Sequence, residues 1–138
     1  MHLKLIVSDR YRIAAYATER GECPLSIFLE GLEGSLLKDG SRMFALLENV
    51  AREGPPRDTN LVRKLVRGIF EFRKGRIRIA WFADEDRLVI CSHGFIKKSK
   101  ETKKSDIEKA ARIRDQFIAD KRAGNIRILE EEAEGEGR

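Results

Sequence analysis

The sequence has few of the residues that build disulfide frameworks, cysteine metal sites or membrane spans. It contains only two cysteines, Cys23 and Cys91, and their wide separation does not match the spacing of a metal-binding pair. We therefore expect both thiols to be reduced and structural. No apolar run approaches the roughly 18–20 residues of a membrane span, and the first residues lack the apolar core and cleavage site of a secretory signal. We expect a cytoplasmic protein without a membrane partner.

Aromatic residues are also scarce, with one Trp, two Tyr and seven Phe. This argues against a protein that binds single strands mainly by stacking bases on aromatic rings. The chain of 138 residues is 41% hydrophobic, which is enough for one core. We expect a single domain over residues 1–129, followed by an acidic, disordered tail over residues 130–138, and no cofactor or metal.

Charge is abundant and unevenly distributed. The formal net charge is +5, although the tail after residue 129 carries five Glu and one Arg. Between Leu61 and Lys104 there are thirteen Lys or Arg against five Asp or Glu, a local balance of +8. A basic field of this size favours a polyanionic partner, most commonly nucleic acid, although a basic surface can also be merely solubilising.

The segment Gly68–Phe95 predicts three consecutive β-strands. We place a two-residue turn at Lys74-Gly75, because Gly accepts the positive φ of tight hairpin turns. This register sets Arg73 opposite Arg76 and Glu71 opposite Arg78. Since side chains alternate between the faces of a strand, one face is apolar and the other carries three guanidinium groups around one carboxylate.

Elsewhere the pattern predicts helices that pack against this sheet. Pro24 begins a short helix that ends near Gly31–Gly34, and a second helix covers about residues 36–52. Ser105 and Glu108 have the spacing of a capping box, so a third helix is expected to start at Ser105 and to end near Arg122.

The remaining segments are expected to be extended or irregular. Residues 3–7 and 12–18 look extended, and either form a hairpin or join into one strand. Residues 57–67 are expected to be a loop that enters the sheet, with or without a turn of helix, and residues 125–129 a short strand. The strand after the acidic turn at residues 83–86 has apolar residues of both parities, so both of its faces are expected to be covered. The fold class is α+β, with a single antiparallel sheet packed against N-terminal helices and a C-terminal helix.

This order of elements and three short motifs resemble the RelE superfamily, specifically the phage-derived HigB-like branch of type II toxin-antitoxin toxins. The motifs follow approximately the patterns K-L-x-x-G-L-Y-E-L-R, R-Y-R-I-x-Y-F and L-H-G-F-x-K-K, and Glu22–Leu25 at the first helix adds to the likeness. The matching segments are Lys64–Arg73, Gly75–Ile79 and His93–Lys98. The chain departs from the pattern where Glu101-Thr102-Lys103 stands in place of a Lys-Thr-Pro turn.

The resemblance implies a RelE/ParE-like fold and a metal-independent endoribonuclease that cleaves mRNA, commonly on the ribosome. It also implies an antitoxin partner encoded beside the toxin, typically a DNA-binding helix-turn-helix protein. The residue types fit, because cleavage by the 2′-hydroxyl requires cations at the phosphate and groups that move protons. The candidate catalytic residues are Arg73, Arg78, His93, Lys97 and Glu71. The candidate RNA-binding residues are Lys64, Arg67, Arg76, Lys98 and Lys100.

Two of these roles have structural alternatives. Glu71 next to arginines is a poor base, so it is either a proton acceptor or an ion-pair partner that orients Arg78. His93 has the ordinary pKa range of an acid-base group, yet a single His at a strand end is often structural.

Two other functions fit the same fold. One is a ParE-like toxin that inhibits gyrase, and the other is an inactive member that only binds RNA or protein. The sequence leaves the oligomeric state open.

Overall fold

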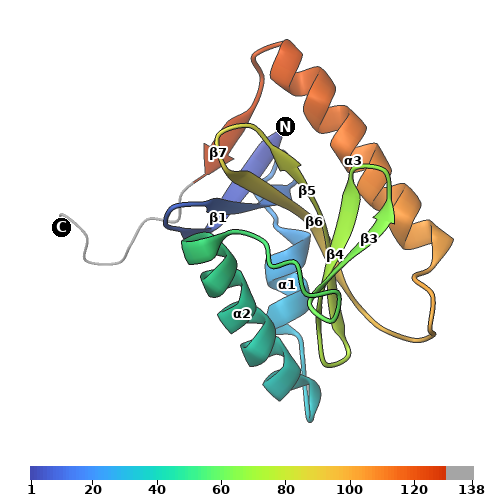
Figure 1. The fold of residues 1–138 in the computed structure, drawn as a ribbon. Helices are drawn as coiled ribbons and strands as arrows, with labels where there is room; N and C mark the ends of the chain where they lie inside the picture. Colours follow the sequence, from blue (N-terminus) through green and yellow to red (C-terminus); the bar gives the residue numbers. More distant parts are fainter. Residues whose placement is uncertain (130–138) are drawn as a thin grey trace.

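The computed structural model describes residues 1–129, and the acidic tail expected over residues 130–138 lies outside the described residues. The described chain has the predicted α+β class, with one sheet and helices on both of its faces (Figure 1). The strands are β1 (His2–Ser8), β2 (Arg12–Ala17), β3 (Val62–Val66), β4 (Ile69–Lys74), β5 (Ile77–Asp84), β6 (Leu88–Ile96) and β7 (Arg127–Leu129). The helices are α1 (Pro24–Glu30), α2 (Leu36–Glu53) and α3 (Lys104–Arg122).

The seven-stranded sheet has the order β3-β4-β5-β6-β2-β1-β7. Neighbouring strands are antiparallel except at two places, where β2 lies parallel to β6 and β7 lies parallel to β1. The sheet is therefore mixed, whereas the sequence led us to expect a wholly antiparallel sheet. The two parallel neighbours are each far apart in the chain, and parallel strands need such long connections.

The two N-terminal extended segments form a hairpin, which decides between the two alternatives left by the sequence. β1 and β2 pair in antiparallel register from His2 opposite Ala17 to Ser8 opposite Arg12, with one irregularity between Leu5 and Val7. The expected short strand near the end of the described chain is also present as β7.

The predicted pairing of the β4–β5 hairpin is wrong by two residues. The turn consists of Gly75 and Arg76, so that Arg73 lies opposite Arg78 and Glu71 lies opposite Ala80. The positive φ of +56° is at Gly75, the first turn residue, as in a Gly-Xaa turn. An even shift keeps the strand side chains on their predicted faces, so Glu71, Arg73 and Arg78 still share one face. Arg76 lies in the turn, however, so two rather than three guanidinium groups accompany Glu71.

One strand was not predicted. Residues 57–67, expected to be a loop, contain β3, which pairs with β4 from Val62 opposite Phe72. Its alternation is obscured because two of its five residues are basic and the pairing is irregular between Lys64 and Val66. This strand forms one edge of the sheet.

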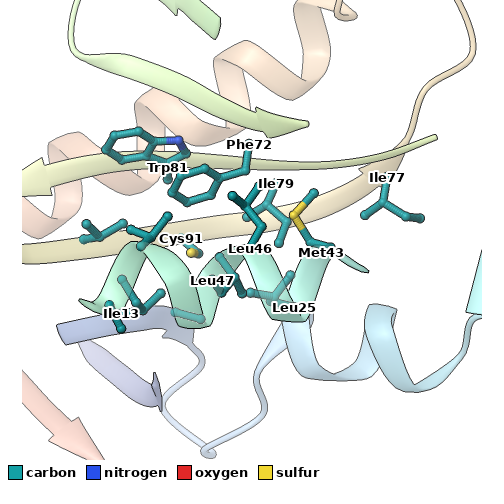
Figure 2. Close-up of a cluster of buried hydrophobic side chains, with 14 of the residues drawn as sticks. Ile13, Leu25, Met43, Leu46, Leu47, Phe72, Ile77, Ile79, Trp81 and Cys91 are labelled. Carbon is teal, nitrogen blue, oxygen red and sulfur yellow. The ribbon is translucent and has the colours of Figure 1, made fainter. Parts of the chain in front are cut away.

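Hydrophobic side chains fill both faces of the sheet, as expected from β6. On one face, Val89 and Cys91 belong to a core cluster that includes α1 and α2 side chains, and Figure 2 shows Met43, Leu46 and Leu47 of α2 pointing toward the sheet. On the other face, the cluster includes Leu88 and Ile90 and the α3 residues Ala110, Ile113 and Phe117. Cys23 and Cys91 are free and buried, as predicted, and burial raises the pKa of the Cys91 thiol.

The helices begin and end close to their predicted bounds, with one correction at α3. Lys103, not Ser105, is the N-cap residue, and no side-chain hydrogen bond caps this helix. Lys103 is extended with ψ at 139°, so Ser105 already lies within the first turn. Among residues 1–129, no helix combines the length and apolarity needed to cross a membrane.

Two leucines of α2 provide a matched test of this packing. Leu47 is completely buried, whereas Leu37 on the same helix is 56% exposed. We predict that Leu47→Ala lowers the free energy of unfolding by about 2–5 kcal/mol, because it leaves a cavity in the core. Leu37→Ala should change it by only about 0.5 kcal/mol. Urea unfolding followed by circular dichroism measures both, and equal losses would contradict the assigned faces of α2.

Candidate functional site

A cavity of about 260 Å³ opens where β6 ends and the loop to α3 begins. Strands β4 and β5, the loop of residues 97–103, the first turn of α3 and Phe28 of α1 surround it. Six cationic side chains and three carboxylates line it, which gives a net positive site. These charged residues are Arg73, Arg78, Lys97, Lys98, Lys100, Lys103, Glu71, Glu101 and Asp106.

A buried carboxylate holds the two arginines of the cavity. Glu71 is only 1% exposed, and its Oε2 lies 3.5 Å from Arg73 Nε and 3.8 Å from Arg78 Nε. Its other oxygen, Oε1, accepts a hydrogen bond of 2.8 Å from Thr102 Oγ1. Both carboxylate oxygens are thus engaged. Glu71 is arranged as the counter-ion of the arginine pair, in agreement with the ion-pair alternative.

The turn between β4 and β5 fixes the guanidinium of Arg78. Nη1 donates hydrogen bonds of 2.9 Å to the carbonyl oxygens of Gly75 and Ile77. Burial lowers the pKa of Arg78, and the positive charge of Arg73 acts in the same direction, while Glu71 raises it. An arginine stays charged under such conditions. The site therefore places a desolvated, fixed positive charge at the wall of the cavity.

The loop of residues 97–103 is fastened to the sheet at three points. Lys97 N donates to Arg76 O over 2.7 Å at its start, and Thr102 donates to Glu71 near its end. Between them, Glu101 Oε2 lies 3.3 Å from Arg63 Nη2 of β3. The residues that replace the Lys-Thr-Pro turn of the resembling family thus tie the loop across β3 and β4.

A β-bulge sets the direction of the His93 side chain. The pairing of β5 with β6 shifts between Ala80 opposite His93 and Trp81 opposite Cys91, so Ser92 is the extra residue. Simple alternation would place His93 on the same face as Cys91. The bulge instead moves it to the face that carries Glu71 and Arg78.

Both ring nitrogens of His93 are hydrogen-bonded within the protein. Nδ1 lies 2.7 Å from Ser92 Oγ, and Nε2 lies 2.9 Å from Asp106 Oδ1. Since a carboxylate only accepts, the neutral ring carries its proton on Nε2 and accepts from Ser92. Burial lowers the pKa of His93, although the hydrogen bond to Asp106 acts to raise it. The ring is 4% exposed and does not line the cavity.

The structure brings together six of the ten predicted site residues. Glu71, Arg73, Arg78, Lys97, Lys98 and Lys100 line the cavity. Four others do not line it. His93 is buried behind Asp106, and Lys64 shares the face of Phe70, opposite to Glu71. Arg67 lies in the β3–β4 turn at the far end of β4, and Arg76 lies in the exposed β4–β5 turn.

Several lining residues were not predicted. Phe28, Phe95, Thr102 and Asp106 contribute to the cavity wall. Thr102 and Asp106 carry no local signal, because their partners Glu71 and His93 lie in other elements. Phe28 could only be expected as a core residue of α1, since the path of α1 beside β6 is a tertiary feature.

The described residues contain no group of three or more His, Cys, Asp or Glu side chains placed to hold a metal ion. Ser92, His93 and Asp106 form a hydrogen-bonded series that resembles a hydrolase triad in composition. Ser92 is fully buried, so its hydroxyl cannot meet a substrate. This series positions Asp106 at the cavity wall.

The lowered pKa of His93 makes stability depend on pH. Its folded-state pKa lies below the unfolded value of about 6.5. The unfolded chain therefore binds the proton more readily, and stability that is complete above about pH 6.5 is lost as pH falls toward the folded-state pKa. We predict that His93→Gln loses less free energy of unfolding than wild type between about pH 7 and pH 5. Urea titrations at both pH values measure the difference, and parallel losses would contradict a buried neutral His93.

Comparison with known proteins gives one family match. The family described as Phage derived protein Gp49-like (DUF891) matches residues 36–115, which span α2, the strands β3–β6 and α3 as far as residue 115. No curated protein matches the chain. The matched segment covers more than half of the sequence and nearly all of the cavity wall. The chain therefore belongs to the phage-derived Gp49-like family, whose members are toxin-like proteins of the RelE/HigB type.

Proposed function

We propose that this protein is the toxin of a type II toxin-antitoxin pair and cleaves mRNA as a metal-independent endoribonuclease, in association with the ribosome. The family implies a toxin-like protein with an antitoxin partner. The observation that carries the finer proposal is the convergence of Arg73, Arg78, Lys97 and Lys98 on one cavity. By the resemblance in sequence, the antitoxin is a helix-turn-helix DNA-binding protein.

The cavity chemistry suits attack by a 2′-hydroxyl on the adjacent phosphate. In this reaction the 2′-oxygen bonds to phosphorus, the bond to the 5′-oxygen breaks, and a 2′,3′-cyclic phosphate and a 5′-hydroxyl result. Negative charge grows on the phosphate oxygens in the transition state, where fixed cations stabilise it most. Arg78 and Arg73 bind these oxygens. The ammonium of Lys97 donates a proton to the leaving 5′-oxygen, and the proton of the 2′-hydroxyl passes to water.

Glu71 and His93 act as positioning residues in this proposal. Glu71 pairs with both arginines and accepts a hydrogen bond from Thr102, which suits a counter-ion better than a proton acceptor. His93 holds Asp106 and is separated from the cavity. Glu71 thus keeps the arginines in place and His93 keeps Asp106 in place, without either residue touching the reacting atoms.

Removal of two cavity cations tests the proposal in cells. We predict that induced wild-type protein arrests growth and creates new mRNA ends, whereas Arg73→Ala/Lys97→Ala abolishes both. Loss of one transition-state contact costs about 100-fold or more in rate. Transcript-end mapping is the measurement.

The matched control is Arg112→Ala/Arg122→Ala, which removes the same charge from exposed positions of α3 and should leave arrest and cleavage unchanged. Growth arrest with intact mRNA would overturn the proposed nuclease activity. The gyrase-inhibiting alternative would then be tested with DNA supercoiling assays. No arrest by wild type, with RNA binding retained, would indicate a member that only binds.

The role of Glu71 has a separate test in the pH dependence of cleavage. Glu71→Gln keeps the size of the side chain but loses the charge that pairs with Arg73 and Arg78. We predict that it lowers kcat by a similar factor at every pH, because a residue that only positions the arginines exchanges no proton with the substrate. A general base would give wild type an acidic limb in the profile that Glu71→Gln lacks. The appearance of that difference would contradict the positioning role.

A further inference from the structure

We propose that Asp39, in the first turn of α2, is a positioning residue that holds two phosphate-binding cations of the cavity through the β4–β5 turn. The proposal rests on the proposed function of the cavity. Asp39 does not line the cavity, and none of the motifs described above contains it.

The contact of Asp39 with the turn is direct. Its Oδ2 accepts a hydrogen bond of 2.9 Å from the backbone N of Arg76. Its carboxylate also lies against Gly75, so closely that a Cβ at this position would overlap it. Gly75 has a φ of +56°, which favours glycine. The turn and the carboxylate are therefore packed together without room for a side chain.

The two turn residues and Ile77, the first residue of β5, hold the cations. The carbonyl oxygens of Gly75 and Ile77 accept both hydrogen bonds of Arg78 Nη1. The carbonyl oxygen of Arg76 accepts from the backbone N of Lys97 over 2.7 Å. Arg76 therefore links the two sides: its N–H donates to Asp39, and its carbonyl oxygen accepts from Lys97, the first residue of the loop 97–103. A displacement of this turn would move Arg78 and Lys97 together, and a displacement of about 1 Å can cost about 100-fold in rate.

The alternative is a purely local role for Asp39. An acidic residue in the first turn of a helix stabilises the helix through its dipole, typically by about 0.3–1 kcal/mol. Asparagine separates the two roles, because it loses the charge but keeps an oxygen that can accept from Arg76 N.

The experiment compares RNA cleavage by purified wild type, Asp39→Ala, Asp39→Asn and the control Glu48→Ala. Glu48 is an exposed carboxylate on the same helix. We predict that Asp39→Ala lowers kcat/KM by about 10- to 100-fold, that Asp39→Asn stays within about threefold of wild type, and that Glu48→Ala has no effect. Thermal unfolding of each variant checks that the protein remains folded. Equal activity of Asp39→Ala and wild type, or equal losses in both Asp39 variants, would overturn the proposal.

A second variant approaches the same contact from the turn. Gly75→Ala places a methyl group against the carboxylate of Asp39, so it should reduce kcat/KM in wild type. The reduction should be smaller in Asp39→Ala, where the overlap is removed, although the backbone strain remains. If Gly75→Ala reduced kcat/KM by the same factor in wild type and in Asp39→Ala, this result would contradict a direct interaction between the turn and Asp39.

Failure of the proposed function gives a different result. If wild type cleaves no RNA, the readout becomes the affinity for a 2′-O-methyl oligoribonucleotide, which cannot react. Weaker binding by Asp39→Ala, restored by Asp39→Asn, would support the positioning of the cations in a binding protein. Equal affinity of wild type and Asp39→Ala would overturn it.

Discussion

A buried carboxylate between two guanidinium groups is the interaction on which the cationic cavity depends. Arg73 and Arg78 lie opposite each other on adjacent strands, and like charges at such positions repel. Glu71 opposes this repulsion from the same face and also holds Thr102. A buried ion pair is costly to break, because the remaining charge has no compensation. The site can therefore present positive charge to a phosphate while the apo protein stays folded.

The elements around this ion cluster each fix one part of it. The β4–β5 turn holds Arg78, the bulge in β6 directs His93 toward Asp106, and the loop of residues 97–103 is attached at both ends. In each attachment a long or ring side chain is bonded to a main-chain carbonyl or a short polar side chain, or one main chain is bonded to another. The lysine side chains of the loop are exposed. The cavity thus combines two arginines held by protein contacts with lysines that face the solvent.

The sequence predicted much of the scaffold because apolar periodicity is a local property. The bounds of α1 and α2 follow from helical spacing and from Pro or Gly near their ends, and the strands β4–β6 from apolar segments between turns. The shared face of Glu71, Arg73 and Arg78 follows from alternation. The register of the hairpin could not be predicted, since the turn is bonded to Asp39 of a distant helix. The strand β3 was missed because Arg63 and Lys64 conceal its alternation.

The candidate site could be predicted only in part. The arginines share a face and the lysines follow the last strand of the meander, so both were identified from position. His93 was placed in the site by a family motif, but the bulge and its contact with Asp106 depend on the path of a loop. Tertiary contacts of this kind leave no trace in local spacing.

The parallel pairing of β7 with β1 affects the order in which the molecule can fold. All cavity residues lie between Phe28 and Asp106, whereas β7 contributes Arg127–Leu129 at the other end of the described chain. During synthesis the segments of the cavity therefore emerge before the strand that covers β1. An uncovered strand edge can pair with other chains, and charged residues such as those of β3 protect a permanent edge from this. β7 thus covers the edge of β1 and becomes the outer strand itself, and with only three residues it offers little edge for pairing with another chain.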